Sequence, residues 1–151
     1  MTSPYAETAA ALRSHFQTSV AAALPLVTVY DNDSVGPQTS RWCRFVIEFY
    51  PSAVQTSTGS PASRRYRMTG RCVALLFEPV GNGKAKGDGA QLELCDTIDV
   101  AFRSISLGTT VQITVGVPAP VGPPEVDSET WWRRRLEIPF RVDYAGSSSE
   151  T

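Results

Sequence analysis

The sequence predicts an α+β fold: two helices packed on one face of a mostly antiparallel β-sheet, with a long β-hairpin arm. The first observation is the alternation in residues 131–144, where apolar side chains occupy the even positions from Leu136 to Tyr144. A period of two is typical of a strand that packs one face on a core. The second is a pair of apolar stripes with helical spacing, at residues 4–24 and 90–105. Two amphipathic helices bury such stripes together against one face of a sheet.

The predicted helices have recognisable ends. Ser3 and Pro4 suit the N-cap and first turn of the first helix, and Pro25 is expected to stop it. Asp88 lies near the start of the second helix, which is expected to end at Gly108. The first stripe comprises Tyr5, Ala9, Leu12, Phe16, Val20 and Leu24, and the second comprises Leu94, Cys95, Ile98, Ala101, Phe102 and Ile105.

Strands are expected at residues 26–30, 41–50, 64–78, 109–117 and 131–144. Residues 73–77 are apolar on both faces, which is typical of a central strand. Strands 41–50 and 64–78 would pair as the hairpin with the long arm. Pro139 has no N–H to donate, so the closing strand is expected at an edge of the sheet, or with this position pointing away from a ladder.

Long segments without periodicity separate these elements, at residues 51–63, 79–89 and 116–130. Such loops are usually functional or disordered, so we expect some of them to become ordered only against other subunits. Residues 1–145 are expected to form a single domain, and the Ser-rich residues 146–151 a disordered tail.

Composition and charge argue against several classes of protein. The net charge is −1 and the pI about 5.8, so no global field attracts nucleic acid or anionic lipid. No leader peptide or run of 18 apolar residues is expected to direct the chain into a membrane. Cys43, Cys72 and Cys95 are expected to be small buried hydrophobes, because they are odd in number and His15 is the only histidine.

No enzyme class is supported by the sequence. A nucleophilic site would have to use His15, which is better interpreted as a solvated or interface histidine. The glycine segment GNGKAKGDG at residues 81–89 lacks the spacing of a phosphate-binding loop. Asp96 and Asp99 lie on one helix as a solvated face rather than a metal pair. We therefore expect no catalytic residue, no cofactor and no metal.

Arginines and tryptophans on two predicted strands are the candidate site. They can form a solvent-facing surface, make intersubunit ion pairs with Asp31, Asp33, Glu125, Asp127 or Glu129, or bind phosphate with Tyr66 and the tryptophans as stacking platforms. The candidate interface residues are Arg64, Arg65, Arg67, Arg71, Trp131, Trp132, Arg133, Arg135 and Arg141.

Several stretches together resemble a known family. They are an alanine-rich N-terminal helix, RRYRMTGRCVALLFEPVGNGKAKG at residues 64–87, LELCDTIDVAFR at 92–103, and WWRRRLEIPFRVDY at 131–144. In this order and spacing they resemble the tail terminator, or tail completion, proteins of long-tailed bacteriophages, of the lambdoid terminator type. The resemblance covers about residues 5–145. Residues 51–63 and 116–130 depart from it, so contacts made by those loops cannot be transferred.

The resemblance implies a structural virion protein that acts in the phage tail and neck and assembles in the host cytoplasm. It implies a hexameric ring that caps the tail tube, ends tube polymerisation and joins the tail to the head connector or stopper protein. Genomic DNA would pass through the ring without specific binding. The alternatives are another neck component, such as a head–tail stopper or adaptor-associated protein, and a nucleic-acid-binding module that uses the arginine clusters.

Overall fold

The computed structural model describes residues 3–24, 26–31, 33–34, 36, 38, 40–51, 53–57, 64–79, 87–108, 110–128 and 131–145, except for the side chains of residues 87–90, 123, 124 and 126–128. Over these residues it confirms the predicted α+β fold, with helices on one face of a mostly antiparallel sheet. The strands are β1 (Val27–Tyr30), β2 (Trp42–Phe49), β3 (Val54–Gln55), β4 (Arg65–Pro79), β5 (Ser106–Leu107), β6 (Gln112–Val115), β7 (Ala119–Ser128) and β8 (Trp131–Ala145).

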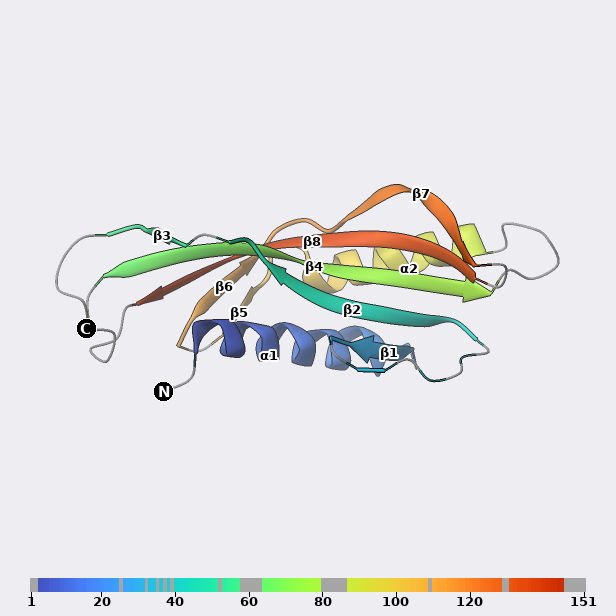
Figure 1. Ribbon diagram of the computed structural model, residues 1–151, viewed down its shortest axis with the longest axis horizontal. Helices are drawn as coiled ribbons and strands as arrows, with labels where there is room; N and C mark the ends of the chain where they lie inside the picture. Colours follow the sequence, from blue (N-terminus) through green and yellow to red (C-terminus); the bar gives the residue numbers. More distant parts are fainter. Residues whose placement is uncertain are drawn as a thin grey trace.

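Strands β4 and β8 form the centre of the sheet and run along most of the molecule (Figure 1). They pair antiparallel over their whole length, from Arg65 opposite Ala145 to Pro79 opposite Trp131. Strands β2 and β3 both pair with the edge of β4 that faces away from β8, one after the other. Strands β7 and β6 both pair in the same manner with the edge of β8 that faces away from β4. Strand β1 adds to β2 in parallel, and β5 adds to β6. The expected pairing of strands 41–50 and 64–78 is thus confirmed.

Helix α1 (Pro4–Phe16) begins where the sequence predicts. The Ser3 side chain accepts a hydrogen bond from the N–H of Ala6 at 3.5 Å, which satisfies one of the free donors of the first turn. The helix continues as a π-helical segment, η1 (Gln17–Ala21), in which the N–H of Ala22 donates to the carbonyl of Gln17 at 2.9 Å. Pro25, the expected stop, lies outside the described residues.

The π-helical segment explains why the predicted stripe is wrong at its C-terminal end. A wider turn changes which positions face the sheet. Val20 and Ala21 are therefore both buried, whereas Leu24 is exposed. Tyr5, at the other end of the stripe, is also partly exposed, although its ring packs against Phe49 with 4.9 Å between centroids.

Helix α2 (Gly87–Phe102) begins before the predicted residue 90 and ends before residue 105. Ser104 adopts a positive φ of 55° directly after the helix, and β5 follows. The expectation that Gly108 ends the helix is wrong, because this glycine forms the turn between β5 and β6. Its φ is +96°, and a Cβ there would come within 2.2 Å of the Val111 carbonyl oxygen. The Asp88 side chain lies outside the described part.

The closing strand β8 is an inner strand, so its expected position at an edge of the sheet is wrong. Pro139 instead satisfies the second expectation from the sequence, a position whose missing N–H points away from a ladder. The N–H of Gly116 donates to the Pro139 carbonyl at 2.8 Å, just beyond the end of β6, and β7 pairs with β8 only from Glu137. The missing N–H of Pro139 therefore faces the junction between β6 and β7, where no ladder bond is needed.

Two segments expected to be loops contain strands. Residues 119–128 form β7, although they include several prolines, because proline is compatible with extended backbone on an edge strand. The pairing of β7 with β8 is irregular between Val121 and Glu125. In the segment 51–63, Val54 and Gln55 form β3 beside β4, and residues 58–63 lie outside the described part.

The helices cover one face of the sheet, which we call the inner face, and the hydrophobic core lies between them. Phe16, Phe45 and Phe102 are fully buried there, and the rings of Phe16 and Phe45 stack with centroids 4.3 Å apart. The register places even positions of β4 and β8 on this face and odd positions on the opposite, outer face. Among the described residues, no helix is long and apolar enough to span a membrane.

Candidate functional site

Most of the candidate interface residues share the outer face of the sheet. Two do not: Arg64 precedes β4, and Trp132 lies on the inner face. The residues at odd positions of β4 and β8, which lie on the outer face, are Arg65, Arg67, Arg71, Trp131, Arg133, Arg135 and Arg141. The strand periodicity of the sequence therefore identified residues that share one face of the sheet.

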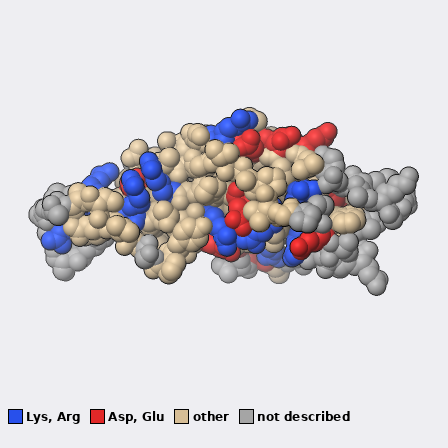
Figure 2. Space-filling model, turned by 90° about the horizontal axis from the view of Figure 1, so that it is seen from above, with Lys and Arg blue, Asp and Glu red and all other residues tan. Residues whose placement is uncertain are grey.

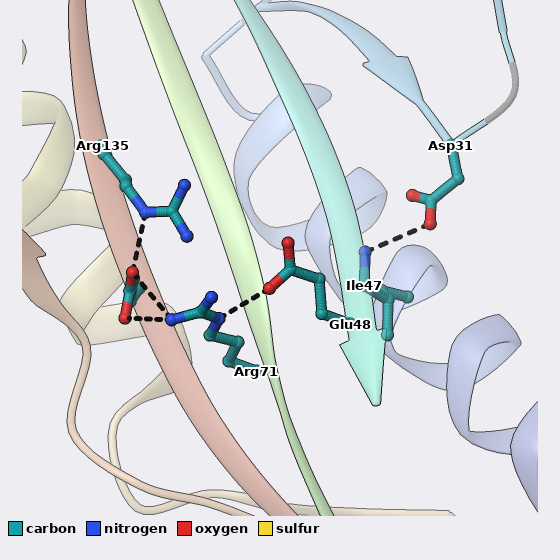
Figure 3. Close-up of polar contacts among 6 residues, drawn as sticks. Asp31, Ile47, Glu48, Arg71 and Arg135 are labelled. Atoms are coloured by element: carbon teal, nitrogen blue, oxygen red, sulfur yellow. Dashed lines mark hydrogen bonds and ion pairs between the residues drawn. The ribbon is translucent and has the colours of Figure 1, made fainter. Parts of the chain in front are cut away.

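The middle of the outer face carries an ion network that joins three strands (Figure 3). The Arg71 Nε on β4 donates to the Glu48 carboxylate on β2 at 2.6 Å, and its Nη1 donates to both Glu137 oxygens on β8 at 3.1 and 3.2 Å. The Arg135 Nε donates to the same Glu137 at 2.7 Å. We call these four residues the central network, and it pairs charges within one chain.

The central network shifts the pKa values of two of its members. The hydrogen bond from Arg135, aided by the charge of Arg71, holds the pKa of the Glu137 carboxyl below its usual value. The hydrogen bond from Arg71 to Glu48, together with the nearby Glu137, raises the pKa of the Arg71 guanidinium. Both shifts favour the charged forms, so the network is stable as an ion cluster at neutral pH.

One end of the outer face is aromatic. Trp42 stacks on Phe77 with 4.1 Å between ring centroids and 5° between ring planes, and Trp131 meets Trp42 edge-on at 6.3 Å. Val29 joins them in a small second cluster, in which Trp42 and Phe77 are buried. Trp131 is thus partly used in packing and does not form a free stacking platform.

The other end of the outer face is basic. We call it the arm: β3 together with residues 65–69 of β4 and 141–145 of β8. Arg67 donates to Asp143 at 2.8 Å and Arg141 lies 3.9 Å from the same carboxylate, whereas the exposed Arg65 has no carboxylate partner among the described residues. Seen from above, blue atoms predominate at the left end of the molecule, where β3 lies, and mix with red atoms over the middle (Figure 2).

The acidic residues proposed as intersubunit partners make local contacts where the structure describes them. Glu125 on β7 accepts from the Arg133 guanidinium at 3.0 Å. Asp31 lies 3.6 Å from Arg13 and accepts the Ile47 N–H at 3.2 Å. Asp33 accepts the Tyr30 N–H at 3.2 Å. The side chains of Asp127 and Glu129 lie outside the described part.

His15 and the three cysteines are used in packing. His15 on α1 lies 2.7 Å from the Ala101 carbonyl through its Nε2, and its ring meets Phe102 edge-on at 4.7 Å, so it joins the two helices. Burial raises the pKa of the Cys43 and Cys72 thiols, and raises that of Cys95 to about 11. These thiols are therefore weak nucleophiles at neutral pH.

Within the described ranges, no group of three or more His, Cys, Asp or Glu side chains could hold a metal ion.

Comparison with solved structures supports the fold. One solved protein structure superposes with a TM-score of 0.62, and the match covers 87% of this chain and 92% of that chain. The sequence identity is 16%, so the similarity concerns the fold alone. No protein-family model and no curated protein matches the sequence.

Buried polar residues on the inner face were not identified from the sequence. Arg134 is almost fully buried there, beside the thiol of Cys95. Gln91 on α2 donates from Nε2 to the carbonyls of Leu76 at 3.0 Å and Trp132 at 3.2 Å, which ties the helix to both central strands. The sequence contains a pattern that could have predicted the burial of both residues. Arg134 occupies an even position of its strand, like the buried Leu136, and position 91 continues the apolar stripe of α2.

Proposed function

We propose that this chain is a structural virion protein: a tail-terminator-like subunit that assembles into a ring, caps the tail tube, ends its polymerisation and joins the tail to the head connector. The proposal rests on the resemblance over residues 5–145, which joins four segments in one order. Another neck component, a stopper or adaptor-associated protein, would share the same ring-like assembly.

The observation that carries the proposal is the outer face of the sheet. The described part of it has no covering helix and combines an internally paired ion network with a basic arm. Paired charges keep such a face polar and rigid, which suits contacts with other proteins better than covalent chemistry. A ring would use heterologous contacts, in which one patch of each subunit meets a different patch of the next.

The test is to purify the chain and add it to growing tubes of the tail tube protein from the same virus. Tube lengths measured by electron microscopy are expected to stop increasing, with a cap of ring density at one end of each tube. Tubes that keep growing and carry no cap would contradict the proposal. Binding at the head side of an already capped tail would favour a stopper instead.

A nucleic-acid-binding module is the second candidate, and the basic arm is the observation that favours it. The described side chains of the arm include three arginines, Arg65, Arg67 and Arg141, and a single carboxylate, Asp143. Binding through the arm would be strongly weakened by salt. A fluorescent single strand and a duplex, titrated at low salt, test this function, and the absence of binding would remove it.

A further inference from the structure

Helix α2 and the π-helical segment η1 border an apolar groove on the helix side of the molecule. The groove has a volume of about 510 Å³ and is lined by Ser19, Asp96, Thr97, Val100 and Ala101. Val100, in the last turn of α2, is 66% exposed and contributes its apolar side chain to this lining. The groove and the exposed valine beside it can therefore pack against an apolar side chain of a second protein.

The rim of this groove is acidic. Glu93 and Asp96 are exposed on the same side of α2, and no described cation pairs with either of them. Arg103, which follows α2 directly, already pairs with Asp99 at 3.4 Å. The groove therefore fits a partner that offers an apolar side chain surrounded by positive charge.

The arm has this chemistry. Val54 on β3 is 61% exposed and lies directly opposite Arg67 on the outer face. Arg65 on β4 and Arg141 on β8 lie on the same face of the arm, and the Arg141 side chain is 51% exposed. An apolar centre with a basic rim is complementary to an apolar groove with an acidic rim.

The two surfaces cannot meet within one chain, because the arm presents these residues on the outer face and α2 packs on the inner face. We infer that the arm of one subunit binds the α2 groove of a second copy, with Val54 against Val100 and Arg141 beside Asp96. The contact is heterologous, so repeating it closes a ring or extends a filament. The inference rests on the proposed function for the expectation that subunits assemble, but it concerns only contacts between copies of this chain.

The experiment measures self-association by sedimentation equilibrium from about 1 µM to about 1 mM, with three single charge reversals. Arg141→Glu and Asp96→Arg each place like charges in the contact, so each is expected to weaken self-association at least about tenfold. An equimolar mixture of the two variants is expected to restore it, because every contact in an alternating assembly again joins opposite charges. Arg44→Glu makes the same change of charge on the outer face away from the arm and is expected to have little effect.

Two further variants separate assembly from folding. Arg141→Gln removes the charge without adding a carboxylate beside Asp143, and Val100→Ser removes the apolar contact from an exposed position. Both are expected to keep the circular dichroism spectrum and thermal midpoint of the unmodified chain while weakening self-association.

The inference is overturned if the unmodified chain stays monomeric at the highest concentration, or if the mixture associates no better than either variant alone. Loss of nucleic-acid binding in Arg141→Glu with unchanged self-association would assign the arm to nucleic acid instead. If the chain caps tubes but the mixture of Arg141→Glu and Asp96→Arg does not regain self-association, this contact is wrong and the proposed function stands. If the mixture regains self-association but the chain does not affect tube growth, the contact is supported and the proposed function is wrong.

Discussion

Among single residues, Glu137 is the one on which the outer face depends most. It accepts hydrogen bonds from Arg135 and Arg71, and Arg71 in turn donates to Glu48 on β2, so the carboxylate anchors the arginine that links three strands. Its pKa is lowered in the folded chain. A carboxylate with a lowered pKa adds stability above its unfolded pKa, and this stability is lost as pH falls through the folded pKa.

We therefore predict that Glu137→Gln lowers the free energy of unfolding at pH 7 by about 1 kcal/mol, a value kept small because solvent screens partly exposed pairs. The difference from the unmodified chain should begin to shrink as pH approaches the usual glutamate value of 4.5, and should disappear only below the lowered pKa of the folded chain. Urea unfolding at several pH values measures this. Glu125→Gln, which affects one exposed pair with Arg133, is the control and should change stability less. A deficit that is the same at all pH values would contradict the prediction.

Gly70 is the second residue with a clear role. A Cβ at this position would lie 2.4 Å from the Glu48 carbonyl oxygen and 2.7 Å from the Phe140 ring, so the β2 backbone and this ring both need the absence of a side chain. We predict that Gly70→Ala destabilises the chain by about 1–3 kcal/mol through overpacking. The thermal midpoint checks this against Gly36→Ala, where nothing lies within 4 Å of the added Cβ. Equal midpoints for the two variants would contradict the prediction.

The sequence predicted which arginines share a face but not what they contact. Parity alone places Arg135 on the same side as Glu137, because both lie on one strand and alternation is a local property of a strand. The ion pair between Arg71 and Glu48 requires the register between β2 and β4, which depends on tertiary packing. For this reason pairing within the chain could not be distinguished from pairing between subunits.

At the level of secondary structure, errors arose where backbone geometry departs from the regular period. The π-helical segment turns Ala21 toward the core and Leu24 toward the surface, and no pattern of residues in 17–21 predicts a π-helix. Strand β7 was missed because proline is usually evidence against a strand. Once β7 is known, the central position of β8 follows, since a strand with neighbours on both sides cannot be an edge.

The arrangement of strands predicts an order of hydrogen exchange. The amides of residues 72–76 in β4 and 135–137 in β8 are expected to exchange slowest, because each of these stretches is paired on both sides and Cys72, Ala74 and Leu136 are buried. The amides of β3 and β1 should exchange first, since both are short and lie at the margin of the sheet. Exchange followed by mass spectrometry tests this, and protection of β3 equal to that of β4 would contradict it.

For the whole molecule, the periodicity of apolar residues was sufficient to predict the architecture but not the order of the strands in the sheet. The two stripes and the alternating strands correctly gave two layers with helices on one face, because burial follows directly from the spacing of apolar residues. The second cluster around Trp42 and Phe77 could not be predicted. Its aromatic residues come from strands that are adjacent only after the sheet has formed.

The junction of β6 and β7 opposite Pro139 has a consequence for how the chain can change. Because the ladder is already interrupted there, the exposed Val117 and the following Pro118 lie outside the register that pairs β6 and β7 with β8. Residues added at this seam would lengthen a surface bulge, at a cost that grows only slowly with its length. The chain thus contains a built-in insertion point at which new sequence can be displayed while the central pair of strands stays intact.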